Sequence, residues 1–319
     1  MRNRCGPLIF LILTFSCFIY SCYSQNTLNL VTYSKKFGIG YRICVDKDYV
    51  YMTNNKGLEI IDVRQPEKPK KVSLVPTGVS FGICVKDSMA YISGRGGLII
   101  ADIRDPENPE IINEYVLGVE TRGIQVKDHH AYITSDRGLE ILDTSDPSRI
   151  SRIAHVGNDG MRAVEICDNI AYLAAPGRGV YVVDVTDPIS SQVITSLAGT
   201  KGAWNLHLHD EFLYVARHGE GISIFDISDK KHPRLLGSFR DDDQGEAQGV
   251  WGDGRYLFVS DNYGIEVLDV TDPGNPYEID EYASVRAAHD ICSDGNYIYV
   301  ASASKGFMVL EFSLTANKH

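Results

Sequence analysis

The stretch Gly57-Leu-Glu-Ile-Ile-Asp62 decides the fold, because a segment of the same design recurs seven times along the 319 residues. Each copy is a glycine that opens a short apolar run ending in an acidic residue. The other six copies begin at Gly97, Gly138, Gly179, Gly221, Gly264 and Gly306. The steps between successive glycines are 40, 41, 41, 42, 43 and 42 residues. A near-constant period of this size, in a chain with strand signals and no helical period, is typical of β-propeller blades.

The two ends of the chain predict how the ring of blades closes. Each repeat shows four strand signals, but the last, from Ile291 to Phe312, supplies only three. The segment Leu28–Tyr33 precedes the first repeat and can act as the missing strand, which removes two exposed sheet edges. We therefore expect an all-β, seven-bladed propeller with four-stranded blades, forming one domain over residues 25–319. The blades are expected near residues 36–76, 77–117, 118–157, 158–198, 199–240, 241–283 and 284–314, the last completed by a strand at 28–34.

Residues repeated in every blade are expected to be structural. The second strand carries an aromatic residue in each repeat, which indicates packing between blades. These aromatics are Tyr51, Tyr91, Tyr132, Tyr172, Tyr214, Phe258 and Tyr299. The acids that end the third strand resemble a ring of catalytic or metal-binding carboxylates. They are Asp62, Asp102, Asp143, Asp184, Asp226 and Asp269. Because they recur blade after blade, we expect them to accept hydrogen bonds from the amides of their own turns.

The first 24 residues have the pattern of a signal peptide. Arg2 and Arg4 precede the apolar run Leu8–Tyr20, which is too short to span a bilayer, and cleavage would leave Gln25 as the new terminus. The alternative is a lipoprotein with a lipid anchor on Cys22, and in both cases no transmembrane segment is expected. The formal net charge is −11, and loss of the two leader arginines makes it more negative, so nucleic acid is excluded as a partner.

Four cysteines remain outside the leader. Cys44, Cys84 and Cys292 share one repeat position in adjacent blades, where facing sheets are about 10 Å apart. That separation is too large for a disulfide, so we expect buried free thiols.

The repeat resembles that of the LVIVD-repeat family, on strands such as Ile60-Ile-Asp-Val63 and Val182-Val-Asp-Val185. The resemblance extends over roughly residues 28–313 and implies an exported or cell-surface propeller. It implies no particular chemistry, because propellers serve as binders, scaffolds and enzymes alike.

A binding site is expected where equivalent positions differ between blades on one face. The connections into the innermost strands and those between second and third strands emerge at one end of the channel, which we call the mouth. Two residues before the apolar position of each inner strand, the blades carry Tyr41, Phe81, Arg122, Arg162, Trp204, Gln248 and His289. Arg122 and Arg162 are on consecutive blades and could converge on one anionic group, while Trp204 could stack on a sugar or aromatic ring.

Basic residues in the neighbouring loops strengthen the expectation of an anionic ligand. They are Lys56, Arg95, Arg137, Arg178, Arg217, His218 and Lys305. The alternative is that several arginines pair internally with Glu120, Asp136 or Asp159. The ligand expected at the mouth is therefore an anionic or carbohydrate-like molecule, or another protein.

An enzyme is the alternative to a binding module, and a passive surface scaffold is a third possibility. Glu165 and His207 lie on adjacent blades and could form an acid–base pair, with His289 as another candidate for proton transfer in a hydrolase or lyase. A hydrogen-bonded polar seam that includes Gln125 explains the first two equally well and is favoured.

No cofactor or metal is predicted. Asp241, Asp242 and Asp243 suggest calcium, but they lack the alternate spacing of a calcium loop, so a solvated acidic loop is favoured. His207 and His209 lie on one side of a strand, as zinc would require, without an assured third ligand.

Overall fold

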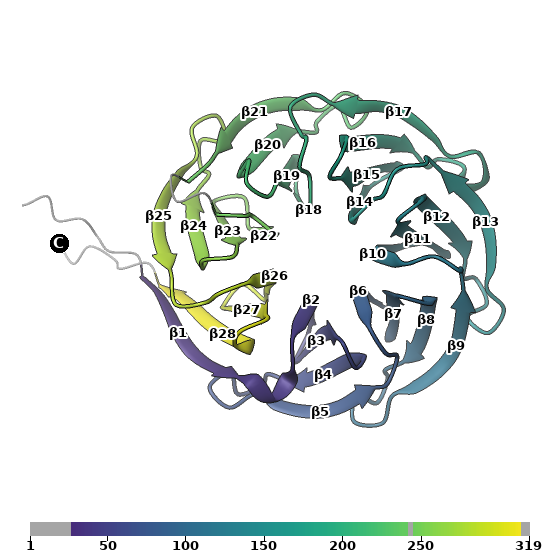
Figure 1. Ribbon diagram of the computed structural model, residues 1–319, viewed down its shortest axis with the longest axis horizontal. Coiled ribbons are helices and arrows are strands. Elements are labelled where there is room, and N and C mark those ends of the chain that lie inside the picture. The colour runs from purple at the N-terminus through teal and green to yellow at the C-terminus, as the bar shows by residue number, and fades with distance from the viewer. Residues whose placement is uncertain (1–26, 242–244, 314–319) are drawn as a thin grey trace, which may run out of the picture.

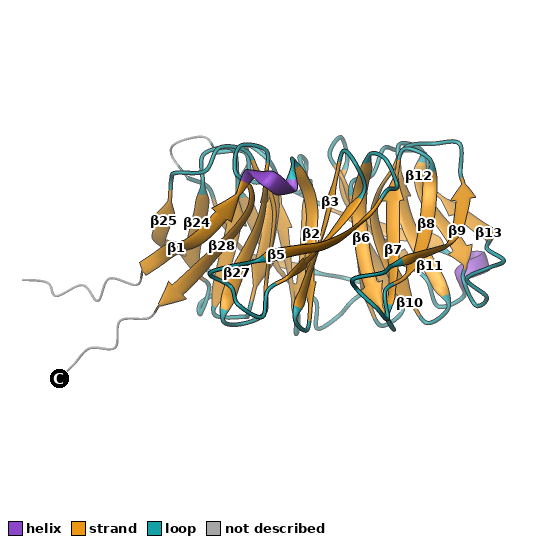
Figure 2. Cartoon of the chain, turned by 90° about the horizontal axis from the view of Figure 1, so that it is seen from below, coloured by secondary structure: helices purple, strands orange, loops and turns teal. Residues whose placement is uncertain are grey.

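The computed structural model describes residues 27–241 and 245–313 and confirms the predicted architecture. Seven four-stranded antiparallel sheets are arranged radially around a central channel (Figure 1). Seen from the side, the strands run between two faces that carry the loops (Figure 2). The proposed signal peptide, including Cys22, lies outside the described residues. No helix among the described residues is long and apolar enough to cross a membrane.

Each blade runs from an innermost to an outermost strand. Blade 1 contains β2 (Gly40–Asp46), β3 (Tyr49–Asn54), β4 (Leu58–Asp62) and β5 (Lys70–Val75). Blade 2 contains β6 (Ser80–Lys86), β7 (Met89–Gly94), β8 (Gly97–Asp102) and β9 (Glu110–Val116). Blade 3 contains β10 (Thr121–Lys127), β11 (His130–Ser135), β12 (Gly138–Asp143) and β13 (Ser151–Val156). Blade 4 contains β14 (Ala163–Cys167), β15 (Ile170–Ala175), β16 (Gly179–Asp184) and β17 (Gln192–Leu197).

The remaining blades follow the same order. Blade 5 contains β18 (Asn205–His209), β19 (Phe212–Ala216), β20 (Ile222–Asp226) and β21 (Arg234–Phe239). Blade 6 contains β22 (Gly249–Gly252), β23 (Tyr256–Ser260), β24 (Ile265–Asp269) and β25 (Tyr277–Tyr282). Blade 7 contains β26 (Ala288–Ser293), β27 (Tyr297–Ser302) and β28 (Gly306–Ser313), with β1 (Thr27–Ser34) as its outer strand. Two short 3-10 helices, η1 (Lys35–Phe37) and η2 (Pro188–Ser190), complete the described elements.

The pairing of β1 with β28 closes the ring, as the sequence predicts. The two strands are antiparallel, with Leu30 opposite Leu310. The amide of Leu28 also donates to the Asp280 carboxylate of blade 6 at 2.5 Å. The first and last strands in the sequence are therefore neighbours in one sheet. The edges that they present to each other are paired and not exposed.

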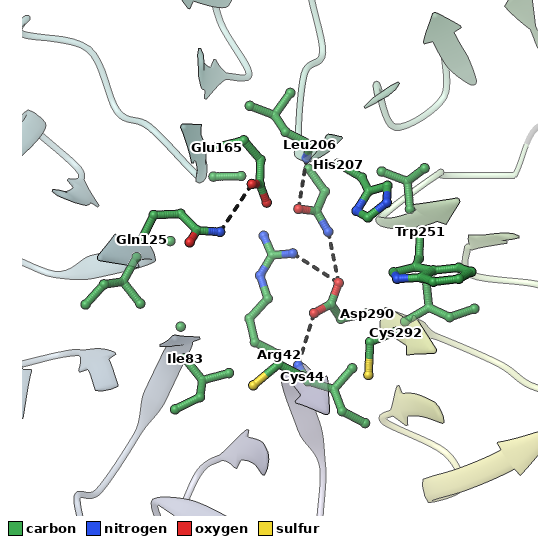
Figure 3. A pocket seen from close by; sticks show the side chains of 18 of the residues that line it. Arg42, Cys44, Ile83, Gln125, Glu165, Leu206, His207, Trp251, Asp290 and Cys292 are labelled. Atoms are coloured by element: carbon green, nitrogen blue, oxygen red, sulfur yellow. Dashed lines mark hydrogen bonds and ion pairs between the residues drawn. The ribbon is translucent and has the colours of Figure 1, made fainter. Parts of the chain in front are cut away.

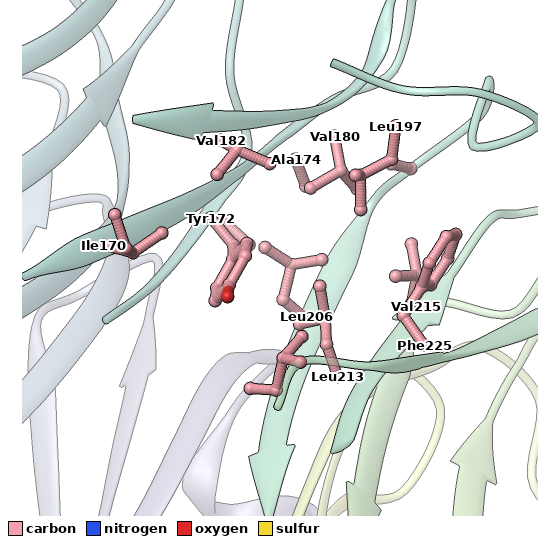
Figure 4. Packing of buried hydrophobic residues seen from close by; sticks show 13 residues of the cluster. Ile170, Tyr172, Ala174, Val180, Val182, Leu197, Leu206, Leu213, Val215 and Phe225 are labelled. Atoms are coloured by element: carbon pink, nitrogen blue, oxygen red, sulfur yellow. The ribbon is translucent and has the colours of Figure 1, made fainter. Parts of the chain in front are cut away.

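The hydrophobic core lies between adjacent blades. Between blades 4 and 5, Tyr172 and Val182 of one sheet pack near Leu206 and Leu213 of the next (Figure 4). The repeated second-strand aromatics are buried, as expected for packing between sheets. Each blade thus depends on its neighbours for most of its apolar burial.

The repeated glycine is required by close approach to the outer strand. Gly57 has a φ of +145°, and a Cβ built on it would lie 2.0 Å from the carbonyl oxygen of Val75. No other residue tolerates both the backbone conformation and the lack of space.

The repeated carboxylates are structural. In each case one carboxylate oxygen accepts a hydrogen bond from the amide two residues later. The distances from amide nitrogen to carboxylate oxygen are 3.0 Å for Asp62, 2.9 Å for Asp102, 2.9 Å for Asp143, 3.0 Å for Asp184, 2.8 Å for Asp226 and 2.9 Å for Asp269. The prediction that this ring serves its own turns is confirmed.

Candidate ligand-binding site at the mouth of the channel

The seven positions predicted at the mouth line a single cavity of about 230 Å³. They come together because every connection from an outer strand to the next inner strand arrives at the same end of the channel. The lining residues are Tyr41, Phe81, Arg122, Arg162, Trp204, Gln248 and His289, together with Arg42. Arg42 is the one lining residue that the sequence reasoning did not assign.

The guanidinium of Arg162 lies over the Trp204 ring. Its guanidinium carbon lies 3.9 Å from the centroid of the indole ring, which is the geometry of a cation–π contact. The His218 ring lies 4.0 Å from the same indole, centroid to centroid. Two groups this close to one ring must occupy opposite faces, so neither face of Trp204 is open to a sugar. Trp204 therefore supports Arg162 and does not offer the stacking surface that the sequence suggested.

Arg122 is neutralised by acidic neighbours. Its guanidinium lies 2.6 Å from Glu120 and 3.2 Å from Asp136, measured between nitrogen and carboxylate oxygen. It also lies 5.5 Å from the centroid of the Phe81 ring. The alternative of internal pairing is correct for Arg122, and it also applies at the rim to Arg95 and Arg178. Their ion pairs are 4.0 Å to Glu120 and 3.5 Å to Asp159, respectively.

Arg162 differs from Arg122 because no ion pair or side-chain hydrogen bond holds its guanidinium within the described part of the chain. Burial lowers the pKa of Arg162 to about 10, with repulsion from Arg122 as the next cause. The group still carries its charge at neutral pH. The mouth therefore contains one half-buried cation that has no ion pair within the described residues.

An arc of aromatic rings faces Arg162 across the mouth. Tyr41 is near-parallel to His289, with ring centroids 5.9 Å apart and an interplanar angle of 18°, and it lies 5.4 Å from Phe81. These three residues belong to blades 7, 1 and 2, whereas Arg162 belongs to blade 4 on the far side of the ring (Figure 1). The Nδ1 atom of His289 lies 2.8 Å from the Gly40 carbonyl oxygen. A neutral ring must donate at Nδ1, which leaves Nε2 as an acceptor.

A hydrogen-bonded hub crosses the channel directly below the mouth. The buried Asp290 carboxylate accepts from Arg42 at 3.2 Å, from the Ile43 amide at 3.0 Å and from the Asn205 amide group at 2.9 Å (Figure 3). It thereby joins blades 7, 1 and 5. Burial raises the pKa of Asp290, while Arg42 opposes that rise.

The sequence indicates this hub at one position of the repeat. One residue before the inner apolar position, four blades carry small residues, namely Gly82, Gly123, Ala163 and Gly249. Arg42, Asn205 and Asp290 occupy the same position in the other three blades. A large polar residue where four of the seven blades have glycine or alanine indicates a local departure from the repeat.

The channel continues below the hub as a second cavity of about 290 Å³. On its wall, Gln125 donates to Glu165 at 3.2 Å and lies 3.8 Å from the thiol of Cys84. The favoured prediction of a polar seam between blades is thus confirmed. Burial raises the pKa of Glu165 to about 8, so this carboxyl is largely protonated at neutral pH.

Glu165 and His207 do not form the acid–base pair that the sequence suggested. The Nε2 atom of His207 lies 2.9 Å from the Gly252 carbonyl oxygen, on the side away from Glu165. Within the described residues, no hydrogen bond or ion pair joins the two side chains. Burial lowers the pKa of His207 to about 4, so its ring is neutral at physiological pH.

The four cysteines are free thiols, as predicted. Only Cys292 is buried, however, whereas Cys44, Cys84 and Cys167 are partly exposed, so the expectation of complete burial was wrong. Two of them, Cys44 and Cys292, line the cavity below the hub, and water in the channel can reach its wall.

The structure adds little on metals. Among residues 27–241 and 245–313, no group of three or more His, Cys, Asp or Glu side chains is placed to hold a metal ion. Asp242 and Asp243, two of the three carboxylates considered for calcium, lie outside the described residues.

These features define a seven-bladed propeller with a small, partly cationic cavity at one end of its channel. The chain belongs to the LVIVD-repeat family. The family model, described as the LVIVD repeat, matches residues 38–77, 77–116, 118–156, 201–241, 244–284 and 285–314. Blade 4, which supplies Arg162 and Glu165, is the blade that these six matches pass over.

Solved structures that resemble the chain are also propellers. The β-propeller domain of Cps50 (Swd1) from Myceliophteria thermophila has a TM-score of 0.75 at 12% identity, covering 90% of this chain and 100% of that one. The WD40 propeller domain of Doa1 has a TM-score of 0.68 at 11% identity, covering 90% and 97%. The computationally designed Ika8 protein has a TM-score of 0.66 at 10% identity, covering 89% and 99%. Likeness at this identity shows the fold alone, and comparison with curated protein sequences gives no match.

Proposed function

We propose that this protein is a binding module that holds an anionic group at the mouth of its channel, with Arg162 as the principal contact. The observation that carries the proposal is the charge of Arg162, which is half-buried and has no ion pair among the described residues. An unpaired cation removed from bulk water is costly, and an incoming anion offsets that cost through charge-assisted hydrogen bonds.

The surroundings of Arg162 support the same proposal. Burial lowers the pKa of Arg162, repulsion from Arg122 and Arg42 lowers it further, and Asp136 and Glu120 oppose that change. A bound anion would relieve this repulsion. The walls of the cavity are low-dielectric aromatic rings, which strengthen the attraction relative to open water.

Export through the leader forms part of the proposal. Residues 1–24 combine two arginines, an apolar run of suitable length and small residues before a cleavage point. The binding module would then act outside the cytoplasm, free or held by a lipid on Cys22. Its ligand would be either a small anion or an acidic group of another protein.

The test is a titration of the purified protein with acetate, phosphate and sulfate, followed by calorimetry. We expect at least one of these ions to bind, and Arg162→Gln to weaken that binding about tenfold or more. Arg178→Gln is the matched control, because Arg178 lies at the same face but is exposed and paired with Asp159. Equal binding by both variants, or no binding of any ion, would contradict the proposal and favour a passive scaffold.

An enzyme remains the second candidate because His289 lines the same cavity as Arg162 with its Nε2 atom free to accept a proton. In a hydrolase or lyase, Arg162 would position a substrate anion and His289 would act as the base. This candidate predicts turnover that His289→Ala abolishes while anion binding persists. Binding without turnover for any ligand that the mouth accepts would eliminate it.

A further inference from the structure

We infer that the ligand of the mouth is a small monoanion in which a single carboxylate is attached to a flat, apolar ring. This inference rests on the proposed function and specifies the chemistry of its ligand. It follows from the ion pairs at the mouth, the position of Arg162 over Trp204 and the aromatic rings that line the cavity.

The ion pairs at the mouth favour a ligand with a single negative charge. Three arginines line the cavity. Arg42 is paired with Asp290, and Arg122 is paired with two carboxylates. Arg162 alone has no ion pair among the described residues, and Asp136 and Glu120 offset part of its charge from a longer distance. A ligand with a second negative charge would bring it close to carboxylates that already serve the other two arginines, so a dianion such as phosphate is disfavoured.

The planar guanidinium group of Arg162 favours a planar anion. The guanidinium of Arg162 lies over the Trp204 indole, with its carbon 3.9 Å from the ring centroid, and this contact restricts how the group can turn. His218 on the opposite face of the indole braces the stack. A carboxylate lying in the guanidinium plane can accept two parallel hydrogen bonds from this fork.

The aromatic rings that line the cavity indicate which kind of group carries the carboxylate. His289, Tyr41 and Phe81 form a continuous arc of rings, and these rings line the same cavity as Arg162. A flat ring attached to the carboxylate would lie against these aromatics, where offset or edge-on ring contacts are favourable. The Gln248 side chain, also in the lining, can serve one polar substituent on that ring.

The size of the cavity limits the ligand to about one ring. Its volume of about 230 Å³ is below the roughly 300 Å³ at which pockets for drug-sized molecules begin. The hub of Arg42, Asn205 and Asp290 forms the floor and separates the mouth from the cavity below. A long polymer or a second ring system would therefore extend out of the mouth into solvent.

The experiment compares four probes by calorimetry on the purified protein, namely benzoate, acetate, phosphate and benzyl alcohol. We expect benzoate to bind about tenfold or more tightly than acetate, because its ring is removed from water, and more tightly than phosphate or benzyl alcohol. Arg162→Gln should weaken benzoate binding about tenfold or more. Tyr41→Ala should reduce benzoate affinity more than it reduces acetate affinity, because only benzoate has a ring to lose contact with Tyr41.

The controls separate this inference from the proposed function. Circular dichroism and thermal melting establish that each variant is folded, and Arg178→Gln should bind benzoate as the unmodified protein does. Arg162-dependent binding of acetate or phosphate, with benzoate no tighter, would overturn the inference and leave the anion site standing. Benzyl alcohol binding as tightly as benzoate would also overturn it. Absence of binding by all four probes would overturn both.

Discussion

Two rings of polar residues encircle this propeller, and only one of them is a candidate site. The first consists of the carboxylates that end the third strands, such as Asp62 and Asp226. The second consists of the residues at the mouth. In the first ring every carboxylate already accepts a hydrogen bond from its own turn. In the second ring, Arg162 has no such partner among the described residues.

Whether a polar group has a partner in its own turn distinguishes scaffold residues from site residues in this repeat protein. A repeated polar residue such as Asp62 is satisfied within its own turn, because the same local structure forms in successive blades. A residue that differs between blades contacts its neighbours across the channel, as Arg42 does with Asp290. Changes to repeated residues should therefore alter stability, whereas changes at the mouth should alter binding. We expect the effects on stability to decrease in the order given below.

The largest effect is expected from removing β1. Deletion of residues 27–34 leaves β28 as an exposed edge and removes the only strand that joins the two ends of the described chain. We expect the shortened protein to lose its cooperative thermal transition and to aggregate, because closure protects both edges. A chain that begins at Thr27 is the matched control and should melt as the full chain does. A cooperative melt at an unchanged temperature without β1 would show that closure contributes little.

The next effect is expected from the repeated glycine. Gly57→Ala places a methyl group 2.0 Å from the Val75 carbonyl oxygen at a φ of +145°, so we expect a loss of about 3 kcal/mol in the free energy of unfolding. Gly78→Ala is the control, because Gly78 has a φ of +71° and open space around it, and should cost about 1 kcal/mol. Denaturant unfolding measures both values. Equal losses would mean that backbone conformation alone, and not crowding, explains the repeated glycine.

The fold could be predicted from the sequence because its determinants repeat. The glycine period gave the number of blades, and the apolar segment at Leu28–Tyr33 gave the closure. The seven mouth residues could also be predicted, since a fixed offset within each repeat places them at one level of the channel. Position along the axis is a property of the repeat, and the repeat is visible in the sequence.

Side-chain reach across the channel could not be predicted in the same way. Asn205 on blade 5 bonds Asp290 on blade 7, two blades away, which no offset within the repeat indicates. The repeat placed His207 beside Glu165, yet its ring turns to the Gly252 carbonyl group. These outcomes depend on side-chain rotamers and on competition among partners, which a spacing pattern does not contain.

A smaller, pH-dependent effect is expected at Glu165, which lies in the channel and differs from its equivalents in other blades. Burial raises its pKa to about 8 in the folded protein, above the ordinary glutamate value of 4.5, so the folded state binds more protons than the unfolded state between these values. Stability should therefore fall as pH rises from about 4.5 to about 8.

Glu165→Gln should remove this dependence, because the amide keeps a hydrogen-bonding partner for Gln125 and does not ionise. At pH 8 the variant should be more stable than the unmodified protein, and at pH 4.5 the two should be similar. Denaturant unfolding at both values measures the difference. Parallel pH profiles for the two proteins would mean that Glu165 titrates normally in the folded state.

The smallest effect is expected in the ring of repeated carboxylates. Hydrogen bonds from Ser228 are the largest cause that lowers the pKa of Asp226 to about 2, and Arg234 adds to them. The contribution to stability is thus present above pH 4 and lost as pH falls to about 2. Asp226→Asn keeps an acceptor for the turn amide but loses the charge, so its melting temperature should be lower by a few degrees at pH 7. Below pH 2 the two proteins should melt together.

Asp269→Asn provides the matched control for the contribution of the charge. Asp269 accepts the same turn hydrogen bond, from Thr271 at 2.9 Å, but has no ion-pair partner in the described part of the chain. Asp226, in contrast, lies 2.8 Å from the Arg234 guanidinium. Asp269→Asn should therefore lower the melting temperature at pH 7 by less than Asp226→Asn does. Anion binding at the mouth should be unchanged in both variants, since each carboxylate serves its own turn at the end of a third strand far from Arg162. A loss of binding in either variant would show that the two rings are coupled and that the division between scaffold and site does not hold.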